Sequence, residues 1–208
     1  MVRQELYIGS NYANGLFGKK VLVVGHQKHA TDDEKSKYKN DLNYQYTNTD
    51  ENVKLLEEIC NGTCMTWENP NDRKSWLQFG KLLSGDLAFA LGTKESSDLW
   101  QSIAFCNYLQ VPDFNLEARQ GKDKEEYYQY SEGIFKEYLE ECKPDKIIVW
   151  GKPFEYISRL GNIINKCQCQ LNILTDKTID VLKINHPCRI EKGGYDVEMK
   201  KIKDFLLK

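Results

Sequence analysis

Two short apolar runs, each ending in a glycine, constrain the fold of this chain most strongly. Residues 20–25 read KVLVVG and residues 145–151 read DKIIVWG. Continuous runs rich in β-branched residues are typical of strands that are buried on both faces, as in a parallel sheet covered by helices. Because apolar residues at helical spacing lie between and after the two runs, strands alternate with helices. The pattern predicts an α/β fold with three layers, α/β/α, and a central, largely parallel sheet.

Other segments fit this alternation. Apolar residues three and four positions apart predict helices that contain Val53 to Cys60, Trp76 to Leu83, residues 124–142, Phe154 to Leu160 and Met199 to Leu206. Further strands are predicted within residues 100–110, ending near Asn107, and over Leu171–Leu174 and Val181–Ile184. The polar stretch from Thr31 to Asp50 has little periodicity and is predicted to be a long surface loop.

The size of the chain limits the number of domains, and its net charge limits how it could attract nucleic acid. Its 208 residues are 40% hydrophobic and contain no apparent interdomain linker, so we predict one domain over residues 1–208. The 29 Lys and Arg residues against 31 Asp and Glu residues give a formal net charge of −2. Attraction to nucleic acid would therefore have to come from a local patch and not from the overall field.

The cysteines and the apolar segments indicate the cellular environment in which the chain would work. The seven cysteines are an odd number and follow no signal peptide, which indicates free thiols in a reducing, cytoplasmic environment. No stretch approaches the roughly 20 apolar residues that cross a bilayer, so we expect no membrane partner. Histidines 26 and 29 lack a third ligand at suitable spacing, and we predict neither a metal nor another cofactor.

Polar side chains follow three of the predicted strands. Gly25 leads into His26, Gln27, Lys28 and His29, a second strand reaches Asn107, and a late strand reaches His186. Because the carboxyl ends of parallel strands meet at one edge of a sheet, these side chains are expected to line a pocket there.

The order of four landmarks in the chain resembles that of the uracil-DNA glycosylase superfamily. They are Gly25 with its HQKH continuation, Asn107 within AFCNY, Gly151 within IIVWGK, and His186 with Pro187 within INHPC. The resemblance spans roughly residues 18–190. It implies that the chain has the fold of that superfamily, and that nucleic acid or a nucleotide is its partner.

The resemblance also implies roles for individual residues. Asn107 would read the edge of a base with one donor and one acceptor, His186 would stabilise the negative charge of the departing base, and Gln27 would hold the attacking water. Gln27 and His186 are thus the predicted catalytic residues. The predicted base- or ligand-binding residues are Gly25, His26, His29, Asn107, Pro187 and Cys188.

Two positions depart from the motifs of the superfamily. Its uracil-removing members carry GQDPYH where this chain has GHQKHA, so the neutral Gln27 stands at the position of an Asp. The final motif is HPC instead of HPS, which puts Cys188 at the position of a hydroxyl. Three functions therefore stay open: a glycosylase-type hydrolase acting on DNA, a nucleotide- or partner-binding module without catalysis, and a different hydrolase that uses Cys188 or the paired histidines.

Overall fold

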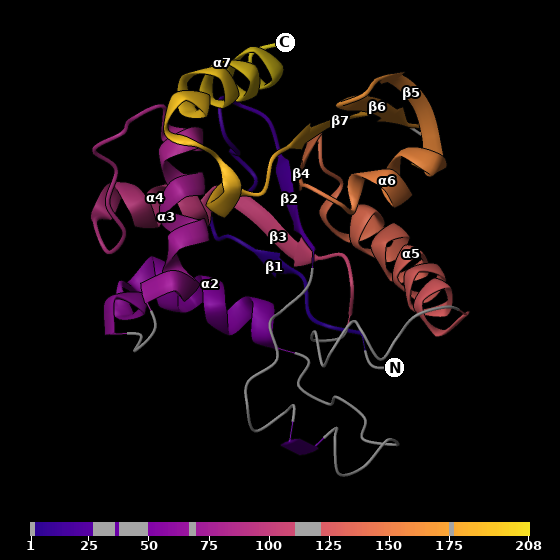
Figure 1. Cartoon of the computed structure of the whole chain (residues 1–208), viewed down its shortest axis with the longest axis horizontal. Coiled ribbons are helices and arrows are strands. Elements are labelled where there is room, and N and C mark those ends of the chain that lie inside the picture. The colour runs from indigo at the N-terminus through magenta and orange to yellow at the C-terminus, as the bar shows by residue number, and fades with distance from the viewer. Residues whose placement is uncertain (1–2, 27–35, 38–49, 67–69, 111–121, 175–176) are drawn as a thin grey trace.

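The computed structural model of the chain describes residues 3–26, 36–37, 50–66, 70–110, 122–174 and 177–208. These residues form a mixed α/β fold around one seven-stranded sheet, in the order β1-β3-β2-β4-β7-β6-β5 (Figure 1). The strands are β1 (Tyr7–Ile8), β2 (Val21–Gly25), β3 (Ile103–Asn107), β4 (Lys146–Trp150), β5 (Gly161–Asn165), β6 (Gln168–Leu171) and β7 (Ile179–Ile184).

The strands at the centre of the sheet are parallel and those at its sides are not. Strands β3, β2, β4 and β7 run in one direction, and β2 and β4 are buried along their whole length. Strands β1, β6 and β5 are antiparallel to their neighbours. The expected α/β fold is therefore confirmed, with four parallel central strands and three strands, β1, β6 and β5, that pair antiparallel with their neighbours. Only two residues join β5 to β6, and so short a connection can join only antiparallel strands.

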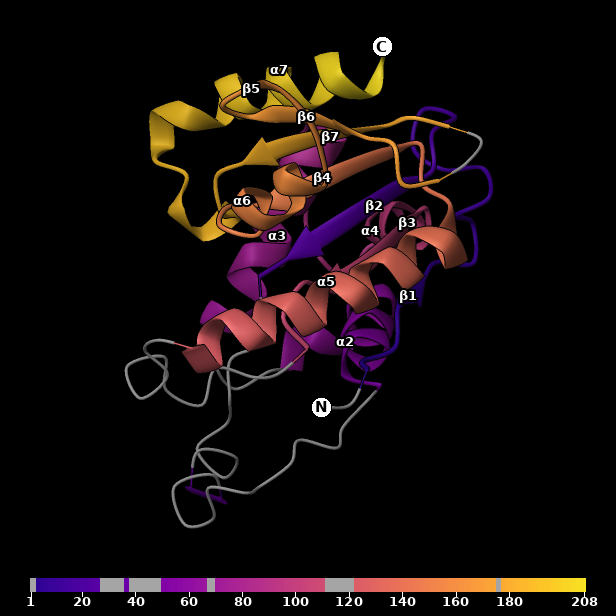
Figure 2. The same cartoon turned by 90° about the vertical axis from the view of Figure 1, so that its right-hand side faces the viewer.

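Helices cover both faces of this sheet. One face packs against α2 (Glu51–Asn61), α3 (Pro70–Ser84), α4 (Lys94–Gln101) and α7 (Tyr195–Leu206). The other face packs against α5 (Lys122–Cys142) and the single turn α6 (Phe154–Ile157). Figure 2, seen from the side of α5, shows this helix in front of the strands and α7 behind β5 and β6.

An aromatic cluster fills the layer between the sheet and α3. Trp76 of α3 lies edge-on to Trp100 of α4, to Phe105 of β3 and to Trp150 of β4, with ring centroids 5.5, 4.8 and 5.2 Å apart. Edge-to-face pairs of this kind stabilise a fold by about 0.5–1.5 kcal/mol each beyond the area that they bury. The cluster therefore fixes the ends of β3 and β4 against the helices.

The segment between β4 and β7 differs most from the sequence-based expectation. The strand predicted over Leu171–Leu174 lies earlier, at Gln168–Leu171, and it pairs with β5, which was not predicted. The predicted helix from Phe154 to Leu160 is the α6 turn followed by the 3₁₀ turn η3 (Ser158–Leu160). Strand β5 has no sequence signature because four of its five residues are exposed, so no buried positions alternate along it.

Two further expectations concern the whole chain. Most of the predicted surface loop, residues 31–35 and 38–49, lies outside the described residues. No helix in the described part of the chain combines the length and the apolar character needed to cross a membrane. One domain over residues 1–208 stays a prediction.

Candidate functional site

The central strands bring four of the predicted landmarks to one edge of the sheet. Gly25 ends β2, Asn107 ends β3, and these two residues are partners in the parallel register. Gly151 follows β4, and His186 follows β7. Because these strands are parallel, the order along the edge is Asn107, Gly25, Gly151 and His186. The carboxyl edge of an open α/β sheet is where such folds bind ligands.

Gly25 allows the Asn107 side chain to lie over the end of β2. A Cβ atom at position 25 would lie 2.6 Å from Asn107 Oδ1 and 3.1 Å from Phe105 Cζ. Beyond this point the two strand exits remain paired, because Tyr108 N–H donates to the carbonyl of Gly25 at 2.9 Å. The glycine is therefore required sterically, since any larger residue would displace the Asn107 amide.

A buried network of amides orients Asn107. This residue is only 8% exposed, and its Nδ2 donates to Asn52 Oδ1 at 2.9 Å. Asn52 Nδ2 in turn donates to Gln4 Oε1 at 3.0 Å and to the carbonyl of Glu5 at 3.3 Å. A backbone carbonyl only accepts hydrogen bonds, so the Asn52 nitrogen faces Glu5 and its oxygen faces Asn107. The nitrogen of Asn107 is thereby directed toward Asn52.

This network leaves half of the Asn107 amide available. Within the described residues, Asn107 Oδ1 accepts no hydrogen bond and Nδ2 donates only the one to Asn52. One acceptor and one N–H therefore remain, which is the pair that matches the edge of a base such as uracil. Gln110 supports the same strand end, because its Nε2 donates to the carbonyl of Asn107 at 3.0 Å and its Oε1 accepts from Tyr138 OH at 2.8 Å.

His186 precedes the 3₁₀ turn η4 (Pro187–Arg189). Its Nδ1 accepts the backbone N–H of Cys188 at 3.4 Å. A nitrogen that accepts carries a lone pair, so the proton of the neutral ring is on Nε2. The imidazole lies edge-on to Trp150 with centroids 5.7 Å apart. His186 is thus held at the end of β7 with Nδ1 toward the backbone of η4, and a neutral ring in this orientation carries its proton on Nε2.

Pro187 is buried and Cys188 is half-buried. The Sγ atom of Cys188 lies 2.6 Å from Oγ of Ser75, which belongs to α3. A hydroxyl therefore stands beside this position although the HPC sequence lacks the serine of HPS. Because a hydroxyl is not a base, this contact does not favour the alternative of a thiol nucleophile.

His26 is held among tyrosines of α5 and α6. Its Nε2 is hydrogen-bonded to Tyr128 OH at 3.1 Å. Tyr128 stacks on Tyr156, with centroids 3.6 Å apart and planes 10° from parallel, and Arg159 lies 5.0 Å from the centroid of Tyr156. Burial and the neighbouring Tyr156 raise the pKa of the Tyr128 hydroxyl, which therefore stays protonated at neutral pH. These contacts pack His26 against the tyrosines of α5 and α6, and its predicted ligand-binding role stays a prediction.

Trp150 links the two halves of the edge. It ends β4, which lies between β2 and β7. Its ring centroid is 5.8 Å from that of Phe105 and 5.7 Å from that of His186. The Phe105 ring also lies over Gly25, since its Cζ atom is 3.1 Å from the place that a Cβ atom at position 25 would take. Contiguous aromatic packing thus connects the Asn107 end of the site with the His186 end.

The charged side chains near this edge have both signs. Lys152 and Arg189 are exposed, and so are Glu155 and Glu191, their close neighbours in the sequence. These four residues do not produce an excess of positive charge.

The structure describes some of the predicted site residues and not others. Gln27 and His29 lie outside the described residues, so their roles stay predictions. Sequence reasoning missed Asn52, Ser75 and Trp150. Trp150 had a signal, since it is the last residue of an apolar run, whereas nothing local marks Asn52 or Ser75 as neighbours of Asn107 and Cys188.

Comparisons with known proteins add no assignment. No family model and no curated protein matches the chain. In the part of the chain that the structure describes, no three His, Cys, Asp or Glu side chains gather in a way that could hold a metal ion.

Proposed function

We propose that this chain is a uracil-DNA-glycosylase-like protein, which binds a nucleobase at the carboxyl edge of its sheet and hydrolyses the N-glycosidic bond that joins the base to DNA. The observation that carries the proposal is the Asn107 amide, which Asn52 orients and which keeps one acceptor and one N–H for a ligand. The order of the landmarks on neighbouring strands supports it further.

In this proposal Asn107 selects the base. Its Oδ1 accepts a hydrogen bond from a ring N–H of the base, and its remaining N–H donates to an adjacent carbonyl oxygen. An amide whose orientation is fixed before binding loses little conformational freedom when the ligand arrives. Asn52 is therefore a positioning residue, because it acts on the base only through Asn107.

His186 serves the bond-breaking step. Hydrolysis breaks the bond between C1′ of the sugar and the base nitrogen, and the electron pair of that bond leaves with the base. A water oxygen bonds to C1′, one water proton ends on the base, and the other remains in the new hydroxyl. The Nε2–H of His186 stabilises the negative charge that develops on the base, and Gln27 holds the water.

Abasic-site formation tests this proposal. The purified chain is incubated with single- and double-stranded oligonucleotides that carry uracil, hypoxanthine or other altered bases, over a range of pH. We expect an abasic product from at least one substrate, and a rate about 100-fold lower for His186→Ala. Lys94→Ala, an exposed position on α4, is the control and should keep the rate. Absence of abasic product from every substrate contradicts the proposed hydrolysis.

A second candidate function is binding without bond cleavage on the same fold. Gln27 favours it, because a neutral amide cannot supply the negative charge of the Asp found at this position in the related motif. Thermal unfolding with nucleosides, nucleotides and oligonucleotides separates the two functions. A ligand at 100 times its Kd stabilises the chain by about 2.7 kcal/mol. Stabilisation that depends on Asn107 and yields no abasic product identifies a binding module.

A further inference from the structure

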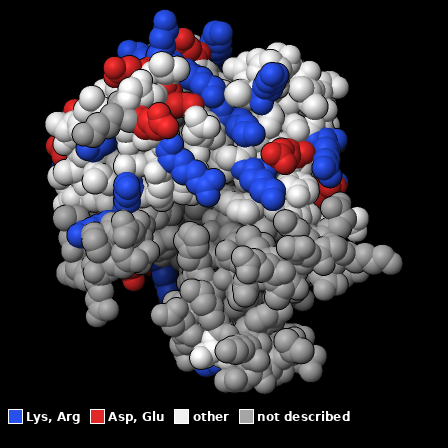
Figure 3. Space-filling view, viewed as in Figure 1, with Lys and Arg blue, Asp and Glu red and all other residues white. Residues whose placement is uncertain are grey.

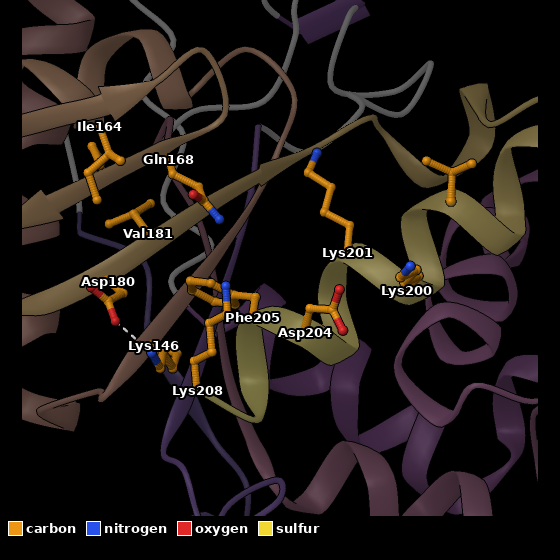
Figure 4. Close-up of a pocket in the computed structure, with 12 residues that line it drawn as sticks. Lys146, Ile164, Gln168, Asp180, Val181, Lys200, Lys201, Asp204, Phe205 and Lys208 are labelled. Carbon is orange, nitrogen blue, oxygen red and sulfur yellow. Dashed lines mark hydrogen bonds and ion pairs between the residues drawn. The ribbon is translucent and has the colours of Figure 1, made fainter.

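A groove that is separate from the carboxyl edge lies between α7 and the strands β5, β6 and β7. Its volume is about 520 Å³. Ile164, Gln168 and Val181 form its strand side, and residues of α7 form the opposite side (Figure 4). Gly25, Asn107 and His186 do not line it. A ligand in this groove would therefore be distinct from a base bound at the proposed site.

Positive charge predominates in this α7 groove. The charged residues that line it are Lys146, Lys200, Lys201, Lys208, Asp180 and Asp204. Figure 3 shows lysine and arginine side chains gathered over the upper half of the molecule, where α7 lies, with a smaller number of acidic side chains among them. A surface of this kind attracts an acidic partner and increases its rate of association.

Two of the four lysines are already paired. Lys146 binds Asp180 at 2.6 Å, as the dashed line in Figure 4 marks, and Lys201 binds Glu198 at 3.5 Å. Lys200 and Lys208 make no ion pair with another described residue, and both are exposed. These two ammonium groups are therefore available to acidic groups of a ligand.

The same groove exposes apolar surface. Ile164 is 56% exposed and Val197 is 68% exposed, and they line opposite sides of the groove together with the buried Val181 and Phe205. Exposed aliphatic side chains that are rimmed by charge are typical of protein–protein contacts. A purely ionic ligand would leave this apolar surface in water, whereas a peptide with apolar side chains would cover it.

The position of the groove leaves it accessible from the side. Strand β5 is the last strand of the sheet, so no described strand covers its outer edge (Figure 1). Ile163, which precedes Ile164 on this strand, is also 66% exposed. A segment of another chain can therefore reach the groove across β5 without displacing a described element.

We propose that the α7 groove binds an acidic, amphipathic segment of a partner protein, whose carboxylates pair with Lys200 and Lys208 and whose apolar side chains cover Ile164 and Val197. Charge complementarity selects this partner over a basic one, and the exposed aliphatic residues select it over a nucleic acid, whose backbone would contact the lysines alone. This interaction goes beyond the proposed function, since it uses none of the residues of the carboxyl edge.

Nuclear magnetic resonance of the full chain tests the proposal with two short synthetic peptides. One peptide contains Glu and Leu, and the other has Lys in place of every Glu. We expect the Glu peptide to produce saturable amide shifts within β5, β6 and α7, weaker at high salt because the charges are screened. The Lys peptide should produce no saturable shifts there. A single-stranded oligonucleotide is added to the bound Glu peptide as a competitor.

Substitutions at exposed positions identify the contacts. Lys200→Glu combined with Lys208→Glu should weaken binding of the Glu peptide about tenfold, and Val197→Ser should weaken it as well. Lys94→Glu, an exposed lysine of α4 that does not line the groove, should leave the affinity unchanged. We expect each variant to keep the fold, because the altered side chains are exposed.

Three outcomes would overturn the proposal. They are absence of saturable shifts in β5, β6 and α7 with the Glu peptide, equal binding of the Lys peptide, and displacement of the Glu peptide by the oligonucleotide. The last outcome would make the groove a nucleic-acid surface. All three are independent of abasic-site formation, so failure here is distinguishable from failure of the proposed hydrolysis.

Discussion

The two ends of the central strands are built from different chemistry. At the carboxyl ends, neutral amides orient Asn107, and an imidazole that accepts a backbone N–H follows β7. Toward the amino ends, Lys146 of β4 is paired in register with Asp180 of β7, and their side chains form an ion pair at 2.6 Å. One end is therefore organised by directed hydrogen bonds and the other by charge.

This difference separates the ligands that each end can select. Hydrogen bonds between neutral groups distinguish ligands by the pattern of donors and acceptors, and salt affects them little. Charged groups attract any ligand of the opposite sign, and salt screens them. We therefore expect the carboxyl edge to discriminate between bases, whereas the α7 groove should discriminate by charge and by apolar contact.

The largest effect is expected from breaking the amide network. Asn52→Leu would leave Gln4, Glu5 and Asn107 without their partner in a buried position. Because unsatisfied buried polar groups are costly, we predict a loss of about 2–3 kcal/mol in the free energy of unfolding. Urea unfolding measures it. Glu57→Leu, on the exposed face of the same helix, is the control. An equal loss of unfolding free energy in both variants would show that the amide network does not stabilise the carboxyl edge of the sheet.

A somewhat smaller effect is expected from adding one methyl group at the end of β2. Gly25→Ala places a Cβ atom 2.6 Å from Asn107 Oδ1, so we predict a loss of about 1–3 kcal/mol through overpacking. Gly133→Ala is the matched control, because nothing lies within 4 Å of a Cβ atom at this position of α5. The control should gain about 0.5–1 kcal/mol from its higher helix propensity. Thermal unfolding of the two variants should therefore shift in opposite directions, and shifts of the same sign would contradict the steric role of Gly25.

The ion pair at the other end gives a pH-dependent prediction. Burial acts to raise the pKa of Asp180, but the hydrogen bonds from Lys146 and Gln170 and the charge of Lys146 lower it below its ordinary value. A carboxylate whose pKa is lowered on folding stabilises the fold above its unfolded pKa of about 3.9, and this contribution is lost as the pH falls through the folded pKa.

Asp180→Asn should therefore destabilise the chain at neutral pH and have little effect in acid. Since the Asp180 side chain is 36% exposed, we predict a loss of about 1 kcal/mol at pH 7 after allowing for solvent screening. Urea unfolding of the variant and the natural chain from neutral pH to about pH 3 checks it. The loss caused by Asn52→Leu should not change over this range. If the loss for Asp180→Asn stayed constant down to about pH 3, charge would not be what stabilises the amino ends of the strands, and the two ends would not differ as proposed.

The smallest effect is expected at the contact between α3 and η4. Ser75→Ala removes the hydroxyl that lies 2.6 Å from Cys188 Sγ. Both residues are half-buried and can bind water instead, so we predict a loss below about 1 kcal/mol in urea unfolding. Cys188→Ser keeps a polar partner for Ser75 and should be close to neutral. A loss above about 2 kcal/mol for Ser75→Ala would show that this contact stabilises the carboxyl edge of the sheet as much as the amide network does.

The central strands were predictable because their burial is continuous. VLVVG and KIIVW, at residues 21–25 and 146–150, carry no polar side chain except the first lysine, and only a strand covered on both faces tolerates such a run. The hairpin of β5 and β6 was not predictable. Along Gln168–Leu171, half-buried Gln alternates with buried Cys and Leu. The segment LNIL, residues 171–174, begins at the last residue of this strand and is more apolar, so its composition predicts a strand more strongly.

The candidate site was predictable only in part. Gly25, Asn107 and His186 could be found because each lies at or just after the end of a strand, and the positions of strand ends follow from the apolar runs. The residues that orient Asn107 could not, since Gln4 and Asn52 are separated by 48 positions and Asn52 from Asn107 by 55. Contacts at such separations depend on how helix α2 packs on the sheet, and no local pattern in the sequence encodes them.

The most direct measurement is an NMR titration of the full chain with free uracil and other nucleobases, which follows the side-chain amide of Asn107 and the ring N–H of His186. If a base binds at the carboxyl edge, both groups shift saturably with at least one base, to the same extent at low and high salt, and Asn107→Asp abolishes the response. Absence of saturable shifts at Asn107 and His186 with every base, or shifts confined to the α7 groove, would contradict base binding at this edge.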